Sequence, residues 1–500
     1  MYSFIISLFL LVAGYIVYGR FVEKVFSPDD RVTPAYRMND GIDYVVLPGW
    51  KVFMIQFLNI AGTGPIFGAI MGAWYGPSAY LWIVFGCIFA GAVHDYFFGM
   101  ASLRGDGASM PHIVGQNLGS GMHKFILVFS CLVLLLVGAV FVLSPATILS
   151  NLMSDGLKNI LIWVTVIFIY YAIATMLPVD KVIGKIYPLF AFSLIFMAVA
   201  LLVVLFIKMP VLPEVWDGVT ANLGEEKLGI KNSDPLFPAL FITIACGAIS
   251  GFHSTQSPLM ARCIKSEKQG RAVFYGSMIT EGIIALIWCT ASSWFFYNEG
   301  WREVCTPEVI AEFTGQTEKT VTQFFSAPTV VMHICNGWLG AFGGVLAVLG
   351  VVAAPITSGD TALRSARLIV AETLHINQTK IGKRLLVSIP IFLVVIALIV
   401  WQVDNPDSFN VIWKYFGWAN QTLAVVTLWT ITVYLVRHNK PYWFVLIPSM
   451  FMTVVSVSFI MVSKTALNLP ATLSYVVAVV VAFIFAALFF RWKTKFDKNK

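Results

Sequence analysis

Long apolar runs recur along the whole chain, each near the roughly 20 residues that a helix needs to cross the hydrocarbon core of a bilayer. Thirteen such runs are present, near residues 2–19, 52–74, 79–100, 124–148, 158–177, 186–207, 236–256, 272–297, 329–358, 385–401, 409–434, 441–462 and 470–490. No basic segment precedes the first run and no A-x-A site follows it, so it is predicted to be a retained helix and not a cleaved leader. The pattern predicts an all-α integral membrane protein with about 13 transmembrane helices, whose first partner is the lipid bilayer.

Composition agrees with this fold class and excludes several others. The 500 residues are 58% hydrophobic and 12% charged, whereas soluble domains carry about 25% charged residues. A water-soluble, disordered or disulfide-stapled secreted chain is therefore excluded. None of the seven cysteines forms a CxxC pair or a set spaced with histidines, and no nucleophile–base motif is present. We therefore expect no enzyme activity, no metal and no cofactor.

The positions of the basic residues indicate how the chain is oriented. If the N-terminus is outside and the loops alternate, 25 of the 33 Lys and Arg fall in inner loops or the C-terminal tail, Arg364 and Arg367 among them, and 7 fall in outer loops. This asymmetry follows the positive-inside rule, and a span missed or added mid-chain would have reversed every later loop. The chain is therefore predicted to have its N-terminus outside and its C-terminus in the cytoplasm. The net charge of +7 is a signal of topology, and no nucleic-acid partner is expected.

Two of the runs contain residues that a straight membrane helix would not favour. The run 52–74 carries Asn59-Ile60-Ala61-Gly62-Thr63-Gly64-Pro65, and the run 236–256 carries Cys246-Gly247-Ala248-Ile249-Ser250-Gly251-Phe252-His253-Ser254. Glycine loosens a helix and proline removes a hydrogen bond. Unwound backbone inside a bilayer is tolerated only where it is buried in protein or lines a cavity. We therefore expect a discontinuous helix in each of these two runs.

The two breaks lie five spans apart, so their helices are expected to cross the membrane in opposite directions. Interrupted helices at corresponding places of two inverted halves are typical of the central site of a transporter, and a close-packed interface of small residues is the alternative. The ends of the fourth and ninth runs, 137–147 and 349–357, add a short third correspondence. The spacing predicts a single transmembrane domain, 1–500, built on an inverted 5+5 repeat. Its parts are an N-terminal extra helix and cytoplasmic loop at 1–51, repeat A at 52–207, repeat B at 236–434, and two C-terminal helices with a basic tail at 435–500.

Ionisable side chains within spans are costly and usually functional. Asp360 follows Thr357 and Ser358, so hydroxyls and a carboxylate lie within about one helical turn and form a candidate site for coupling to Na⁺ or a proton. The alternative is that Asp360 caps the next helix. His253, in the second break, can titrate or donate a hydrogen bond to an anionic substrate. A structural histidine with satisfied hydrogen bonds is the alternative there.

Three further ionisable residues are candidates for a gate or relay. His94 and Asp95 lie in the cytoplasmic third of their run, where a snorkelling interfacial pair is the alternative interpretation. Glu281 lies inside its run, and the sequence names no partner for it. Asn420 and Gln421 are expected to form hydrogen bonds between helices.

A helix broken at mid-depth exposes an N-terminus whose free N–H groups and dipole favour anions. The outer half of the run 52–74 begins near Gly64, so a small carboxylate is a suitable guest. Unwound carbonyls around 59–62 suit a cation, or the ammonium of an amino acid or peptide. The predicted substrate-binding residues are members of the two breaks: Ala61, Gly62, Thr63, Gly64, Pro65, Gly247, Ser250, Gly251, His253 and Ser254.

Six motifs, in order along the chain, resemble those of the carbon starvation protein A family. They are Asp40-Gly41-Ile42-Asp43-Tyr44, Ile60-Ala61-Gly62-Thr63-Gly64-Pro65, Gly91-Ala92-Val93-His94-Asp95, Ala245-Cys246-Gly247-Ala248-Ile249-Ser250-Gly251-Phe252-His253, Ser358-Gly359-Asp360-Thr361 and Ala419-Asn420-Gln421-Thr422-Leu423-Ala424. The resemblance runs from about residue 35 to residue 430. Longer members carry a His-His pair where this chain has Gln56-Phe57, and they extend beyond its C-terminus, so the chain resembles the short branch of the family.

This resemblance implies a transporter of the bacterial plasma (inner) membrane with the inverted-repeat fold of the amino acid–polyamine–organocation superfamily. Members of the family are linked to peptide uptake and to proton-coupled pyruvate uptake during nutrient limitation. By the same resemblance, both breaks would bind substrate, and Thr357 and Ser358 would lie where sodium-coupled relatives bind their cation.

Together these features predict a secondary active transporter that imports a small carboxylate nutrient, pyruvate or short peptides, in response to carbon starvation and coupled to H⁺ or Na⁺. An amino-acid/cation symporter is the alternative. A channel would instead need a continuous pore lined by charged rings or carbonyl groups. The loop at 298–328 is the longest one and is too short for a sensory domain. No feature of the sequence indicates an oligomeric state.

Overall fold

The computed structural model describes residues 1–152, 157–178, 183–219, 222–229, 234–316, 319–404 and 408–499. These residues form helices joined by loops, and no strand occurs among them. From the N-terminus to the middle of the chain the helices are α1 (Tyr2–Ala13), η1 (Gly14–Tyr18), α2 (Gly19–Phe26), α3 (Pro34–Arg37), α4 (Gly49–Ala61), η2 (Gly64–Gly68), α5 (Ala69–Gly72), η3 (Ala73–Tyr75), α6 (Ser78–Leu81), η4 (Trp82–Gly91), α7 (Ala92–Arg104), α8 (Met110–Leu118), α9 (Ser120–Leu152), α10 (Ile160–Met176), α11 (Ile183–Lys208), η6 (Val215–Asp217), α12 (Leu223–Lys227) and α13 (Leu236–Thr243). The rest are α14 (His253–Ala261), η7 (Glu267–Gln269), η8 (Arg271–Tyr275), α15 (Gly276–Tyr297), α16 (Trp301–Val304), α17 (Pro307–Thr314), α18 (Val321–Phe324), α19 (Ala327–Ala347), η9 (Val348–Val352), α20 (Ala353–Thr373), α21 (Ile381–Asp404), α22 (Ser408–Arg437), α23 (Trp443–Val462) and α24 (Ala471–Lys498).

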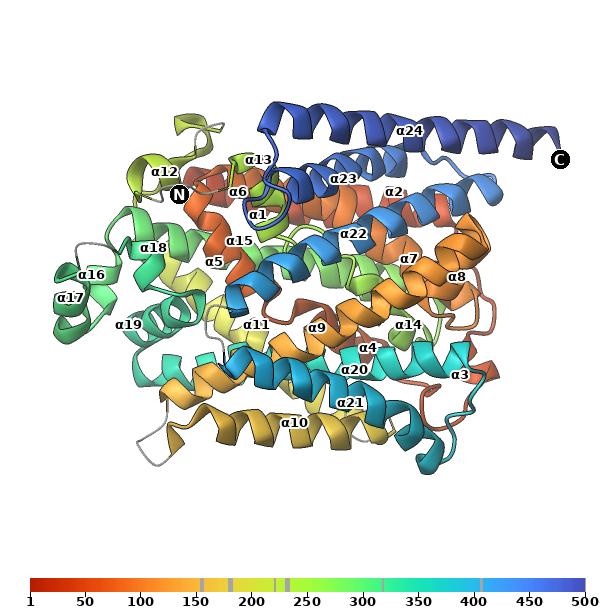
Figure 1. Ribbon diagram of the computed structural model, residues 1–500, viewed down its shortest axis with the longest axis horizontal. Helices are drawn as coiled ribbons and strands as arrows, with labels where there is room; N and C mark the ends of the chain where they lie inside the picture. The colour runs from red at the N-terminus through yellow and green to blue at the C-terminus, as the bar shows by residue number, and fades with distance from the viewer. Residues whose placement is uncertain are drawn as a thin grey trace.

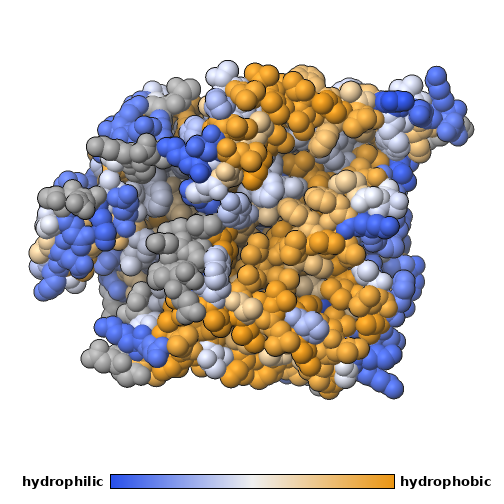
Figure 2. All heavy atoms as spheres, in the orientation of Figure 1, coloured by the Kyte–Doolittle hydropathy of each residue, from blue (hydrophilic) through white to orange (hydrophobic). Residues whose placement is uncertain are grey.

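The long helices extend between two polar ends of the molecule (Figure 1). The short helices α12, α16, α17 and α18 lie at one end together with the N-terminus, and α3, α8 and the C-terminus lie at the opposite end. Figure 2 shows a broad hydrophobic surface between hydrophilic ends. Large apolar side chains are exposed on the outer helices, for example Leu189 of α11 at 63% and Phe483 of α24 at 62%. Such a surface is stable against lipid tails and not against water, which identifies an integral membrane protein.

The helices account for all thirteen predicted runs. Ten segments are long and apolar enough to cross a membrane, and the bent pair Gly49–Ala61 and Gly64–Tyr75 makes eleven. The other two runs correspond to α10, which has 17 residues, and to the broken segment formed by α13 and α14. The predicted all-α fold with discontinuous helices is therefore confirmed.

The predicted ninth run, 329–358, is displaced from the helix that crosses the bilayer. Gly340 has a φ of +62° and interrupts α19, and the membrane-length segment extends from Phe342 to Thr373. Thr357, Ser358 and Asp360 therefore lie in the middle of a span and not at its end. The interpretation of Asp360 as a helix cap is wrong, because it lies inside α20.

The broken helices lie at the centre of the bundle. Helix α20 packs against α9 and α4, and α15 packs against α4 and η2, so both α20 and α15 contact the helices around the first break. Helix α14 packs against α4, α7 and α20, and α22 contacts both α13 and α14. Polar side chains on the two breaks are thus enclosed by protein rather than lipid.

Candidate functional site

The first break interrupts its helix at the predicted residues. Helix α4 ends at Ala61, Gly62 adopts a φ of +47° with a ψ of −144°, and the chain resumes at Gly64 with its axis bent by 53°. Side chains with a Cβ rarely adopt this backbone conformation, so the break requires glycine. Pro65 stands in the first turn of the resumed helix, where its missing N–H loses no helical hydrogen bond. Gly62 and Thr63 are the two residues between the half-helices.

The second break is a longer unwound stretch. Helix α13 ends at Thr243 and α14 begins at His253, and residues 244–252 between them are not helical. Gly247, Ser250 and Gly251 lie in this stretch, and His253 and Ser254 open α14. The first broken helix passes from α4 to α5 and the second from α13 to α14 in the opposite direction (Figure 1), as the odd number of intervening spans predicts.

The two breaks touch each other. A Cβ on Gly64 would lie 2.3 Å from the Cβ of Cys246, and a Cβ on Gly68 would lie 2.7 Å from the carbonyl oxygen of Thr243. A Cβ on Gly247 would likewise lie 2.4 Å from the Cβ of Ala285 on α15. Because these glycines carry no side chain, η2, the unwound stretch and α15 pack closely against one another. The close-packed interface of small residues, which was the alternative interpretation of the breaks, therefore lies at the same place as the predicted substrate site.

Helix α22 holds both ends of the second break. The Asn420 side-chain oxygen accepts the Phe252 N–H at 2.7 Å and the Ser250 hydroxyl at 3.1 Å, at the start of α14. The Gln421 amide donates to the Phe241 carbonyl at 2.8 Å, near the end of α13. These bonds satisfy backbone groups that unwinding leaves without helical partners. The predicted hydrogen bonds of Asn420 and Gln421 between helices are thus confirmed, and their role is to hold the break open as a loop.

Polar atoms without partners gather beside the first break. Asn59, in the last turn of α4, has both amide atoms without a hydrogen bond to any described residue, and the same is true of the Thr63 hydroxyl and of Gln56 Oε1. All three side chains are fully buried. A buried polar atom left unpaired costs about 1–3 kcal/mol, so a cluster of them marks a place where a polar guest is accommodated.

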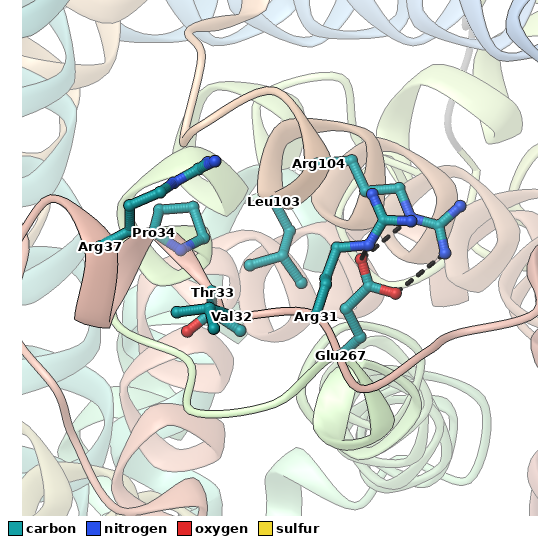
Figure 3. Close-up of a pocket in the computed structure, with 8 residues that line it drawn as sticks. All are labelled: Arg31, Val32, Thr33, Pro34, Arg37, Leu103, Arg104 and Glu267. Atoms are coloured by element: carbon teal, nitrogen blue, oxygen red, sulfur yellow. Dashed lines mark hydrogen bonds and ion pairs between the residues drawn. The ribbon is translucent and has the colours of Figure 1, made fainter.

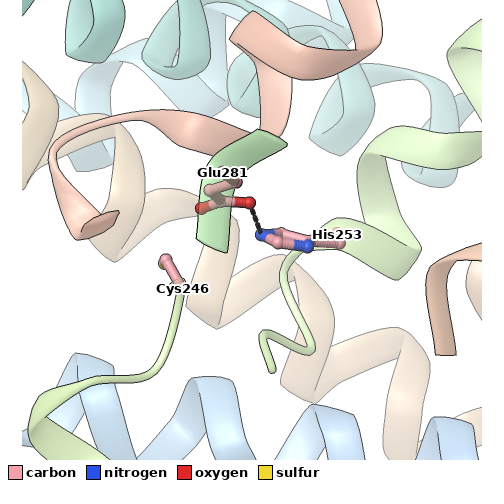
Figure 4. Close-up of side chains that lie close together, drawn as sticks. All are labelled: Cys246, His253 and Glu281. Carbon is pink, nitrogen blue, oxygen red and sulfur yellow. Dashed lines mark ion pairs between the residues drawn. The ribbon is translucent and has the colours of Figure 1, made fainter. Parts of the chain in front are cut away.

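An acid–imidazole cluster lies beside the second break. The Asp95 carboxylate contacts His94 Nδ1 at 2.7 Å and His253 Nδ1 at 2.8 Å, one oxygen to each ring. His253 Nε2 lies 3.6 Å from Glu281 Oε2 of α15, as Figure 4 shows. All four side chains are fully buried.

Two predictions about this cluster are corrected. His94 and Asp95 are not an interfacial pair, because neither is exposed and Asp95 is bound to the second break. His253 is not a fully satisfied structural histidine, because its Nε2 has no hydrogen-bond partner among the described residues. The partner that the sequence did not name for Glu281 is His253.

The three predicted coupling residues on α20 face different neighbours. The Ser358 hydroxyl donates to the Leu58 carbonyl at 2.9 Å and so lies against the end of α4 at the first break. The Thr357 hydroxyl is bonded within its own helix. Asp360 faces α11, where the Tyr187 hydroxyl donates to Oδ2 at 2.6 Å and Oδ1 has no hydrogen bond to a described residue. Only Ser358 of the three thus contacts a break directly.

A connecting strap, residues 27–48, crosses one polar end of the molecule and ties several helices together. Thr33 donates to the Ile264 carbonyl at 2.7 Å, the Leu47 N–H donates to the Cys263 carbonyl at 3.1 Å, and the Tyr44 hydroxyl donates to the Asp106 carbonyl at 2.9 Å. The strap leads directly into α4 and therefore connects the first broken helix to the end of the second.

Asp43 of this strap is the partner of two buried arginines. Arg364 Nη1 and Arg367 Nη2 each lie 3.3 Å from Asp43 Oδ1. Their assignment to an inner loop is wrong, because both side chains are fully buried in α20. Burial raises the pKa of the Asp43 carboxyl, but Arg367 and Arg364 outweigh it, so the pKa lies below its ordinary value.

A cavity of about 330 Å³ lies under the same strap (Figure 3). Three arginines line it, and each has an acidic partner: Arg104 binds Glu267 with two hydrogen bonds of 2.9 Å, Arg31 binds Asp29, and Arg37 binds Asp106. Because each arginine is already paired with a carboxylate, we interpret these ion pairs as contacts that stabilise the strap, and not as a binding site for an anion. The other lining residues are Val32, Thr33, Pro34 and Leu103.

Sequence reasoning brought the two breaks together but missed several of their neighbours. Asp43, Arg364 and Arg367 were not recognised as a buried ion-pair set, although Asp43 falls in the first family motif. Cys246 lies in the second break, but the sequence around it indicates no role for its thiol, and the same holds for Tyr187. A tyrosine in an apolar run carries no pattern that would have indicated its contact with Asp360.

The sequence as a whole matches a known family. The model of the family described as carbon starvation protein CstA matches residues 1–162 and 155–459. A Haemophilus influenzae protein described as an uncharacterized membrane protein is 45% identical over 332 residues, which are 58% of this chain and 90% of that one. The Escherichia coli protein named peptide transporter CstA is 24% identical, with 89% of this chain and 78% of the relative covered. The Bacillus subtilis protein of the same name is 25% identical, with 85% and 83% covered.

Solved structures show what fold the chain adopts. Mhp1, a nucleobase-cation-symport-1 family transporter, aligns with a TM-score of 0.52 at 14% identity, over 89% of this chain and 92% of that one. A mutant of the Eremococcus coleocola manganese transporter aligns with a TM-score of 0.50 at 13% identity, over 91% and 98%. The chain therefore shares its fold with these two solved transporters over most of its length. With the family model matching nearly the whole chain, the protein belongs to the carbon starvation protein CstA family.

Proposed function

We propose that this protein is a secondary active transporter that imports short peptides or pyruvate, driven by H⁺ or Na⁺, with the two touching breaks as the substrate site. The observation that carries the proposal is a set of buried polar atoms beside the first break that have no hydrogen bond to a described residue: Gln56 Oε1, both amide atoms of Asn59 and the Thr63 hydroxyl. Relatives in this family are named peptide transporters, which supports a peptide over a nucleobase or a metal as the guest. An amide-bearing substrate supplies both donors and acceptors to such groups.

The closed packing of the breaks supports alternating access. The predicted binding residues of both breaks are buried, from Ala61 and Thr63 to Ser250 and Ser254. Substrate therefore enters only when the helices around the breaks separate on one side, which is the expected behaviour of a broken-helix transporter. A channel would instead keep a continuous open path.

The test is uptake into proteoliposomes by the purified protein. Dipeptides, tripeptides, pyruvate and single amino acids are offered separately under an H⁺ gradient, under a Na⁺ gradient and with neither. We expect a di- or tripeptide, or pyruvate, to accumulate above its external concentration under one gradient and only to equilibrate without it. Equilibration unchanged by either gradient would indicate a channel, and accumulation of amino acids alone would indicate an amino-acid/cation symporter.

Asp360→Asn in the same vesicles locates the coupling. Because the Asp360 carboxylate is fully buried and its Oδ1 has no hydrogen bond to a described residue, we propose that it takes the coupling ion. The coupling roles of Ser358 and Thr357, whose hydroxyls face other neighbours, stay predictions. The variant is then expected to lose gradient-driven accumulation and to keep exchange of internal for external substrate. Tyr187→Phe removes the hydrogen bond but keeps the carboxylate, and serves as the matched control. Full accumulation by Asp360→Asn would show that the coupling ion binds at other residues.

The gate or relay roles of His94, Asp95 and Glu281 stay predictions.

We also propose that the N-terminus faces the outside of a bacterial plasma membrane and the C-terminus the cytoplasm. Gly315 follows α17 at the polar end that holds the N-terminus, and Lys268 lies on η7, next to the strap, and is exposed. A cysteine replacing Gly315 is expected to react with an impermeant maleimide on intact cells. A cysteine replacing Lys268 is expected to react only after permeabilisation, and the reverse pattern would invert the topology.

A further inference from the structure

Three side chains of different chemistry converge beside the second break. The Cys246 sulfur, a His253 ring nitrogen and a Glu281 carboxylate oxygen all lie within 4.8 Å of one another. They come from the unwound stretch, from the first residue of α14 and from α15 (Figure 4). All three side chains are buried. Their spacing in the sequence follows no metal-binding pattern, which is why the sequence led us to expect no metal.

The contact between His253 and Glu281 lacks a donor. Asp95 Oδ2 lies 2.8 Å from His253 Nδ1, and a carboxylate there favours the tautomer that carries its proton on Nδ1. His253 Nε2 then presents a lone pair to Glu281 Oε2 at 3.6 Å. Neither Glu281 oxygen has a hydrogen bond to a described residue. Two acceptors facing each other in a buried site need either a proton or a bound cation between them.

The geometry fits a small tetrahedral cation. Two ligands at about 2.1 Å from Zn²⁺ lie about 3.4 Å apart at the tetrahedral angle, close to the 3.6 Å between His253 Nε2 and Glu281 Oε2. The third ligand atom, Cys246 Sγ, lies within 4.8 Å of both. A thiolate and a carboxylate together neutralise a divalent ion, which removes the cost of burying either charge alone.

The groups behind the ligands support the same assignment. Histidines that bind a metal through one nitrogen usually hold the other against a carboxylate, and Asp95 occupies that position for His253. Asp95 is in turn held by His94 at 2.7 Å. This second layer fixes the ring so that Nε2 faces Glu281 and not the backbone.

We propose that Cys246, His253 and Glu281 form a binding site for a thiophilic divalent transition metal of the Zn²⁺ class, oriented by Asp95. Thiolate and imidazole ligands favour such ions over Mg²⁺, Ca²⁺ or Mn²⁺. The site goes beyond the proposed transport function, because a metal here ties the unwound stretch to α15 whether or not substrate is bound. With three protein ligands, one tetrahedral position stays available to a further ligand.

The test is metal content and spectroscopy of the full-length protein purified in detergent. After equilibration with Zn²⁺ and removal of free metal over a chelating resin, we expect about one Zn²⁺ per chain by mass spectrometry, in keeping with a single three-ligand site. Replacement by Co²⁺ is expected to give the near-ultraviolet charge-transfer band of a cobalt–thiolate bond. Glu281→Gln and Cys246→Ser are expected to lose the bound metal. The matched control is Cys289→Ser, which replaces a buried cysteine that lies on α15 with Glu281 but outside the cluster, and this variant is expected to keep the bound metal.

The Asp95→Asn variant tests separately whether Asp95 orients the His253 ring for metal binding. It leaves all three ligands in place and is expected to weaken Zn²⁺ affinity about 10- to 100-fold. A wild-type protein that retains no stoichiometric metal, or that binds Co²⁺ without the thiolate band, overturns the proposal, and neither result depends on a variant folding. Because binding is measured without substrate or gradient, failure here leaves the uptake panel unaffected, and failure of the panel leaves this site standing.

Discussion

Gly251→Ala is expected to lower the rate of uptake sharply while the protein still reaches the membrane. A Cβ at this position would lie 2.2 Å from the backbone nitrogen of Ala424 and 2.3 Å from the carbonyl oxygen of Asn420. Backbone atoms of a helix cannot turn aside as a flexible side chain can, so α22 or the unwound stretch must shift. Overpacking of this kind costs about 1–3 kcal/mol. The strain falls where Asn420 binds the start of α14, so the geometry of the substrate site is lost first.

The measurement is the initial uptake rate in proteoliposomes at equal protein content. A fall of about tenfold or more is expected, because each 1.4 kcal/mol added to the activation free energy of transport lowers its rate about tenfold. Gly121→Ala is the matched control, because a Cβ there meets nothing within 4 Å. Gly62→Leu should fail like Gly251→Ala, because Gly62 has a positive φ and its Cβ would lie 2.9 Å from Phe141. Normal uptake by Gly251→Ala would remove the second break from the mechanism.

Asp43→Asn is expected to destabilise the fold more than any single exposed charge change. Asp43 is the acidic partner of Arg364 and of Arg367, and both guanidinium groups are fully buried. Removing one partner of a buried ion pair costs about 3–5 kcal/mol, because it leaves the other charge uncompensated. We expect a lower apparent Tm in detergent and lower abundance in the membrane. Asp497→Asn, which breaks an exposed pair with Lys493, should change the free energy of unfolding by about 1 kcal/mol or less.

The effect of Asp43→Asn should also depend on pH with a definite sign. The pKa of Asp43 is lowered in the folded protein, so its contribution to stability is complete above the unfolded pKa of about 4 and is lost as the pH falls through the lower folded pKa. The difference in Tm between wild type and Asp43→Asn is therefore expected to be large at neutral pH and to shrink below about pH 4. A difference that stays constant into acid would show that Asp43 acts through shape and not through charge.

Sequence alone predicted the helices and both breaks, because the bilayer enforces their physical causes. A span must be apolar over a fixed length, and an interruption such as Gly62-Thr63-Gly64-Pro65 is tolerated only inside the protein. These are local properties of the chain. The pairing of the two breaks followed from counting spans, which requires no knowledge of tertiary contacts.

Errors arose where distant contacts override local pattern. The helix that carries Asp360 continues to Thr373 because Asp43, more than 300 positions earlier in the chain, neutralises Arg364 and Arg367. Hydropathy therefore placed the end of this span too early, at residue 358 instead of Thr373. The start of the span, after Gly340, was also missed, because the sequence is apolar on both sides of that glycine. Asp95 was placed at an interface for the same reason. Its partner His253 lies 158 positions away, and nothing local indicates that the two meet.

The hydrogen bonds of α22 have a mechanical consequence for the transport cycle. This helix grips both rims of the second break through Asn420 and Gln421. It is itself fastened to α23, where Trp418 donates to the Ser456 carbonyl at 3.1 Å and Thr422 bonds the Ser456 hydroxyl at 2.8 Å. The second broken helix is therefore coupled through α22 to α23, a helix outside both predicted repeats. Any movement of the second break during transport must therefore carry α22 and α23 with it or break these hydrogen bonds.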